Sequence, residues 1–233
     1  DELPDRAAKV EFHTMVIDSG KGPELCAGIV LESLPPQCSG PIAADLNMEG
    51  WSQEANGVRW GERAVVVTWP PVEGVVQVVA QSEYAPPALE SPFGELPAEC
   101  ENIQLQAGAG PINDYARSLG DQNGDLYVTN GGTLVLQVVG DPAPHREALA
   151  ELGGACVVEV ARNAAEQRRI HDTVHPQLSD LAELAGNYSS STGPGGRVEV
   201  QVPVADRALA QAIARIVDDP TAIRIIGLGI LHP

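Results

Sequence analysis

Four cysteines constrain this chain more than any other feature of its sequence: Cys26, Cys38, Cys100 and Cys156. An even number of cysteines without a Cys-x-x-Cys motif is typical of disulfides rather than of a zinc site. Four cysteines allow three pairings. We expect Cys26–Cys38 and Cys100–Cys156, because each bond would then join residues of a single domain. The alternative is four buried free thiols in a reducing compartment.

Prolines divide the chain into parts. They are concentrated between Tyr84 and Pro97, in a stretch that is also rich in Ser and Glu and is typical of a linker. The whole chain has 233 residues, which is enough for one large domain or two small ones. We therefore predict a β-barrel domain over residues 1–85, a linker over 86–98 and an α/β sandwich domain over 99–233.

The first part has the pattern of an all-β domain. Val10–Ile17 and Leu25–Glu32 are expected strands, and Arg63–Trp69 and Val75–Gln81 are β-branched runs joined by a proline-containing turn. This number of strands suits a small, OB-like barrel.

The second part alternates between strand and helix patterns. Asp141 and Asn163 can each cap a helix, and Pro176 is expected to kink or end the second one. A polar loop is expected over 189–196. From Leu134 onward the order is β-α-β-α-β-α-β, which favours helices layered on a sheet. The predicted fold class for the whole chain is α+β.

The charge of the chain restricts its partners. There are 14 basic and 32 acidic residues, so the net charge is −18. Such a surface repels nucleic acids and anionic lipid head groups. No apolar run reaches the length needed to span a bilayer. We expect a protein partner or self-association rather than a small-molecule ligand.

No recognisable catalytic or metal-binding pattern occurs. The run from Asp121 to Asp125 begins like a calcium loop, but its glycine stands at the wrong position, so a polar turn is the preferred interpretation. His171 and His175 could share a metal from one helical face, but a solvated pair is preferred. Ser19, in Asp18-Ser19-Gly20, resembles a trypsin-like nucleophile, yet it is expected in a hairpin turn. We expect no catalytic residue, metal or cofactor, and no enzymatic activity.

All three tryptophans fall in the predicted β domain: Trp51, Trp60 and Trp69. Exposed tryptophans would mark an interaction surface. In a chain with only 4% aromatic residues, packing into the core is the preferred interpretation, and an interaction surface is the alternative.

Two resemblances add expectations. Pro23–Gly28 and Leu34–Pro41 resemble a paired-cysteine pattern of uncharacterised actinobacterial secreted proteins and lipoproteins, which implies an extracellular or cell-surface location, either secreted or lipid-anchored. Gly124–Thr129 and Thr133–Val139 resemble the ferredoxin-like α/β modules of serine-protease prodomains, which implies a role as an inhibitor or folding chaperone.

Together these features favour a non-enzymatic extracytoplasmic binding protein of a Gram-positive, high-GC bacterium. One alternative is an inhibitor or folding chaperone of a secreted hydrolase, acting through a sheet edge or the apolar tail 225–231. The other is a structural subunit of a surface assembly or filament.

Overall fold

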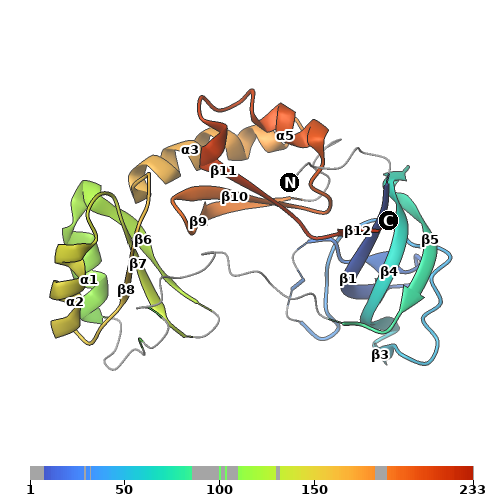
Figure 1. Cartoon of the computed structure of the whole chain (residues 1–233). Helices are drawn as coiled ribbons and strands as arrows, with labels where there is room; N and C mark the ends of the chain where they lie inside the picture. The colour runs from blue at the N-terminus through green and yellow to red at the C-terminus, as the bar shows by residue number, and fades with distance from the viewer. Residues whose placement is uncertain are drawn as a thin grey trace.

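The computed structural model describes residues 8–28, 30–31, 33–85, 100, 103, 110–129, 132–181 and 188–232. Within these residues the fold is α+β, as expected, with one six-stranded sheet, two three-stranded sheets and four α-helices (Figure 1). The predicted linker over 86–98 lies outside the described residues. None of the described helices is long and apolar enough to cross a membrane.

The six-stranded sheet is built around two long antiparallel strands, β1 (Ala8–Asp18) and β4 (Val58–Val72). They pair without interruption from Ala8↔Trp69 to Asp18↔Arg59. The other strands join this pair in the order β12-β1-β4-β3, with β2 beside β1 and β5 beside β4. Their bounds are Glu24–Leu25 for β2, Gln53–Ala55 for β3, Val75–Ser82 for β5 and Ile230–His232 for β12.

Side-chain alternation along β1 produces two separate apolar clusters. Val10, Phe12 and Val16 enter the larger core, where the Phe12 and Trp69 rings lie 5.5 Å apart between centroids. Ile17, the next residue, belongs to a smaller cluster with Cys26 and Trp60. This follows from the two-residue period of a strand, which points successive side chains to opposite faces.

Several expectations for this part need correction. The described strands form an open sheet, and no closed barrel is found among them. The expected strand Leu25–Glu32 is reduced to Glu24–Leu25, because the chain turns into the disulfide loop at Cys26. The hairpin of β4 and β5 is confirmed, but its turn is Glu73-Gly74, both at positive φ. Pro70 and Pro71 lie within β4, where the register with β5 shifts.

The second part contains two small sheets with the same connectivity. In each, a hairpin is followed by a helix and a parallel strand, giving the orders β6-β7-β8 and β9-β10-β11. Helix α1 precedes the first hairpin and α3 the second. The bounds are Gly110–Ser118 (α1), Asn123–Val128 (β6), Leu134–Val138 (β7), Ala143–Glu151 (α2), Cys156–Glu159 (β8), Ala164–Leu178 (α3), Ser189–Gly193 (β9), Arg197–Val202 (β10), Arg207–Ile213 (α5) and Ile223–Gly227 (β11).

Helices layered on one sheet were expected here, whereas the described strands form two three-stranded sheets. The expected polar loop over 189–196 is also wrong in part, because Ser189–Gly193 forms β9 against β10. Helix α3 starts at the expected Asn163 cap, where Asn163 and Glu166 form a reciprocal capping box. It continues through Pro176 and ends at Leu178, so the expected break at the proline does not occur.

Two fully buried glutamines join the small sheets. The Gln167 side chain on α3 donates a hydrogen bond from Nε2 to the Gly124 carbonyl on β6, at 2.9 Å. The Gly196 amide, in the turn between β9 and β10, donates to Gln137 Oε1 on β7, at 3.2 Å. The Gly124 carbonyl and the Gly196 amide therefore find hydrogen-bond partners across the junction between the two small sheets.

The end of the described chain returns to the N-terminal sheet. After β11, the chain crosses to β1, where β12 pairs from Lys9↔His232 to Glu11↔Ile230 (Figure 1). Val204, between β10 and α5, also packs into the larger N-terminal core. Sheet pairing and core packing thus connect the two ends of the sequence.

We predict that Gly229→Ala destabilises the protein by roughly 1–3 kcal/mol, because overpacking a core forces neighbours to shift. A Cβ at Gly229 would lie 2.3 Å from Val10 Cγ1 and 2.9 Å from Phe12 Cε1. The control is Gly110→Ala at the start of α1, where a Cβ meets nothing within 4 Å. Urea unfolding should separate the two variants, and equal midpoints would contradict this account of the β12–β1 contact.

Candidate interaction surface: the Cys26–Cys38 loop

Both expected disulfides are present. Cys26 and Cys38 are bonded with their Cα atoms 5.5 Å apart and close a short loop, which we call the Cys26–Cys38 loop. Cys100 and Cys156 are bonded with their Cα atoms 5.0 Å apart and tie residue 100 to β8. Val135 on β7 packs with this second bond. One bond therefore closes a local loop, whereas the other joins residues 56 positions apart.

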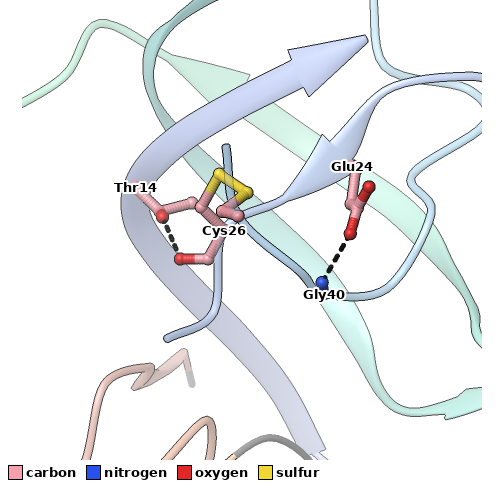
Figure 2. The surroundings of a disulfide bond; sticks show 5 residues. Thr14, Glu24, Cys26 and Gly40 are labelled. Carbon is pink, nitrogen blue, oxygen red and sulfur yellow. Dashed lines mark hydrogen bonds between the residues drawn. A yellow bond between two sulfur atoms is a disulfide. The ribbon is translucent and has the colours of Figure 1, made fainter. Parts of the chain in front are cut away.

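The base of the Cys26–Cys38 loop is fixed to the sheet (Figure 2). The Thr14 hydroxyl on β1 donates to the Cys26 carbonyl at 2.7 Å, and the Cys26 amide donates to the Met15 carbonyl at 3.0 Å. On the far side, the Gly40 amide donates to Glu24 Oε1 at 2.7 Å. A Cβ at Gly40 would lie 1.7 Å from the Leu25 carbonyl oxygen, so only glycine fits there.

The described residues of the loop also form hydrogen bonds with one another. The Leu31 amide donates to the Gln37 carbonyl at 2.8 Å, and the Ser33 hydroxyl donates to the Pro35 carbonyl at 2.7 Å. Pro36 is buried. The disulfide, these bonds and the prolines together restrict the conformations that the loop can adopt.

This constrained loop exposes two large apolar side chains. Leu34 is 77% exposed and Leu31 is 57% exposed, and Leu34 is the most exposed large hydrophobic residue among those described. A single exposed leucine needs no explanation. Leu31 and Leu34 are thus two exposed apolar side chains on a loop whose base is fixed.

The structure places the three predicted tryptophans around the sheet rather than in one patch. Trp69 is 8% exposed and packs in the larger core, while Trp60, also 8% exposed, packs beside the Cys26–Cys38 bond. Trp51 is half-buried: its indole N–H donates to the Asn47 carbonyl, and the Arg63 guanidinium lies 4.9 Å above its ring. Trp60 thus packs against the disulfide that closes the loop. Leu31 and Leu34 were not among the expected contact residues, because a sequence does not show which hydrophobic side chains are exposed.

Asp18 organises the turn next to the loop. Its Oδ1 accepts from the Gly20 and Gly22 amides, and its Oδ2 pairs with the Arg59 guanidinium at 2.6 Å. The hydrogen bond from Arg59 is the main reason that the pKa of Asp18 lies below its usual value. The Asp18 carboxylate therefore stabilises a turn. This gives the triplet Asp18-Ser19-Gly20 a structural role.

The calcium-like run also has a local structural role. Asp121 lies in the 3₁₀ turn Gly120–Gln122, and Asn123 Oδ1 accepts from the Asp125 amide at 3.0 Å. Asp125 Oδ1 accepts from the Leu126 amide at 2.8 Å. Among the residues that the structure describes, no three His, Cys, Asp or Glu side chains come together as metal ligands.

Two further titratable groups lie where the small sheets meet. Burial raises the pKa of Glu199 on β10, although Arg224, whose Nη1 lies 3.3 Å from Glu199 Oε1, opposes this shift. Burial also raises the pKa of Tyr127 on β6, and the nearby charge of Asp125 adds to the effect. These groups lie within a packed junction, and the described contacts do not bring a nucleophile and a base together there.

A hollow of about 460 Å³ lies between α3 and the segment after α5. Its lining includes apolar side chains and charges of both signs: Ile170, Ile216, Val217, Ala222, Arg162, Glu166, Arg169, Asp218 and Asp219. Arg162 is held there by Asp219 and Thr221. The mixture of charges selects no single class of ligand.

The predicted histidine pair lies elsewhere on α3. His171 and His175 stack with 5.3 Å between ring centroids, and both contact Ser190 on β9. His175 is exposed and His171 is partly buried, and both rings also contact the neighbouring strand.

Comparison with models of protein families, with curated proteins and with solved structures finds no match to this chain.

We predict that Asp18→Asn lowers the free energy of unfolding by about 1–2 kcal/mol at neutral pH, because a charge-assisted hydrogen bond is lost. A carboxyl group whose pKa is lowered by folding stabilises the protein above its unfolded pKa. This contribution disappears as the pH falls through the lower folded value. The difference between wild type and variant should therefore shrink below pH 3.8, the ordinary value for this group.

Urea unfolding across this pH range tests the prediction, with the exposed Asp180→Asn as control. A wild-type-to-Asp18→Asn difference that grows on acidification would contradict the assigned role of the Asp18–Arg59 pair.

Proposed function

We propose that this protein is a non-enzymatic binding protein that acts outside the cytoplasm and contacts a protein partner through the Cys26–Cys38 loop. The observation that carries the proposal is the exposure of Leu31 and Leu34 on a loop whose base is fixed by a disulfide and by hydrogen bonds to β1 and β2.

The chemistry of the loop favours a protein surface as its target. Burying an exposed leucine contributes roughly 1.5–3 kcal/mol, and a loop whose ends are fixed loses less entropy on binding than a free segment does. The net charge of −18 disfavours nucleic acids and anionic lipids. A partner with an apolar pocket could bury the exposed leucines. A basic or neutral surface around that pocket would suit the negative charge of this chain.

The cysteines support the location. All four are bonded in pairs, and such bonds persist in oxidising compartments. Lysine occurs only at Lys9 and Lys21, while Ala, Val, Gly and Pro are abundant. These features support a secreted or surface-attached protein of a Gram-positive, high-GC bacterium.

A second candidate is inhibition or folding assistance of a secreted hydrolase. The constrained loop supports this role, since a preorganised apolar side chain on a rigid loop can fill a specificity pocket without further ordering. The apolar tail was the other expected contact, but the structure uses it internally. Ile223–Gly227 forms β11 and Ile230–His232 forms β12. An inhibitor would therefore act through the loop rather than through a free tail.

We predict that replacing both leucines, Leu31→Ser and Leu34→Ser, weakens partner binding at least about tenfold, because both lose apolar contact area. The unfolding midpoint should change little, since both side chains are exposed. Val128→Ser on β6 is the matched control, being 63% exposed and outside the loop.

A photo-crosslinking amino acid at position 34 identifies the partner among secreted and envelope proteins. The same substitution at position 128 shows which products are non-specific. Capture of a hydrolase at position 34 would favour the inhibitor or chaperone role, and capture of the chain itself would favour a subunit of a surface assembly. Identical products at both positions would reject the loop as the contact surface.

A further inference from the structure

The face of α3 that packs on β9 carries a pair of imidazoles aimed at one point. His171 and His175 are one helical turn apart, and their rings are nearly parallel, with 20° between the planes and 5.3 Å between centroids. His171 Nε2 lies 3.2 Å from Ser190 Oγ, and His175 Nδ1 lies 2.7 Å from the same atom. Two nitrogen atoms from different residues therefore converge on a single oxygen.

Neighbouring groups restrict both rings. Asp172 Oδ1 lies 3.4 Å from His171 Nδ1, on the opposite side of the ring from Ser190. When a metal binds Nε2 of a histidine, the other ring nitrogen keeps its proton and can donate it to a nearby carboxylate, and Asp172 is placed to accept it. The Tyr188 ring stands edge-on to His175, with 6.1 Å between centroids. The two nitrogens thus converge because the surrounding contacts orient the rings.

Ser190 offers both its hydroxyl and its backbone carbonyl to the two rings, because His171 Nε2 also lies 3.3 Å from the Ser190 carbonyl oxygen. In the metal-free chain the hydroxyl can donate to one imidazole nitrogen and accept from the other. A divalent cation that displaces these hydrogen bonds would take one lone pair from each ring, with the hydroxyl oxygen beside it as a weak third ligand.

We propose that His171, His175 and Ser190 form an open site for a divalent transition-metal ion. Imidazole ligands select Cu²⁺, Ni²⁺ and Zn²⁺ over Ca²⁺ and Mg²⁺, which prefer oxygen. Copper should bind more tightly than zinc, following the general order of affinities for nitrogen ligands. The remaining coordination positions face the exposed side of α3, where His175 and Asp172 are exposed, and are open to water.

This site is independent of the Cys26–Cys38 loop, since its residues belong to α3 and β9. Its ligands were considered in the sequence as a pair separated by four positions. The strand that brings Ser190 against them was expected to be a loop, so the convergence could not be foreseen.

The test is to titrate the purified, metal-free chain with Cu²⁺ and with Zn²⁺ at neutral pH and to measure binding by calorimetry. The copper form is then examined by electron paramagnetic resonance. The site predicts one high-affinity ion per chain, with imidazole nitrogen coupling in the copper spectrum. His171→Gln and His175→Gln should each weaken copper binding at least about tenfold. Ser190→Ala should weaken it less than either histidine variant.

His13→Gln is the matched control, because His13 lies on β1 beside Glu11 and away from α3. Thermal unfolding of each metal-free variant checks that its fold is intact. The proposal is overturned if His13→Gln lowers the affinity as much as the α3 variants do, or if the bound copper shows no nitrogen coupling. Unchanged binding in a folded His171→Gln variant would overturn it as well.

Discussion

The antiparallel pairing of β1 with β4 is the constraint on which the rest of the structure depends. These strands remain in register from Ala8↔Trp69 to Asp18↔Arg59. β1 also pairs with β2, which leads into the Cys26–Cys38 loop, and with β12, which ends the described chain. A shift of one residue in this register would exchange the two apolar clusters and turn Phe12 away from its core. The position of the Cys26–Cys38 loop, the packing of the larger core and the pairing of β12 therefore all depend on how β1 pairs with β4.

The features predictable from the sequence are those governed by local chemistry. Both disulfide pairings were expected because each joins residues of one predicted domain, and the Asn163 cap follows from the hydrogen bonds that a helix start requires. The β4–β5 hairpin follows from two β-branched runs around a turn. In each case the residues that determine the structure lie close together in the chain or belong to a small set of possible partners.

The features that were missed depend on distant partners. Ser189–Gly193 is rich in serine and glycine and becomes a strand only because β10 lies beside it. Helix α3 continues through Pro176 and ends two residues later, so the proline removes a hydrogen bond from the last turns without ending the helix there. The exposed leucines at positions 31 and 34 could not be told from core residues, since exposure is a property of the folded chain.

The two proposed sites use different chemistry on separate elements. The loop offers apolar side chains on a fixed base, and the α3–β9 face offers two imidazoles. We propose that the conformation of the loop, and not its sequence alone, creates the contact surface. The most direct test compares partner affinity of the wild type and of the double variant Cys26→Ala/Cys38→Ala, under conditions in which circular dichroism shows both to be folded. The variant keeps Leu31 and Leu34 but opens the loop, so its affinity should fall at least about tenfold. Equal affinity of the two proteins would contradict the claim.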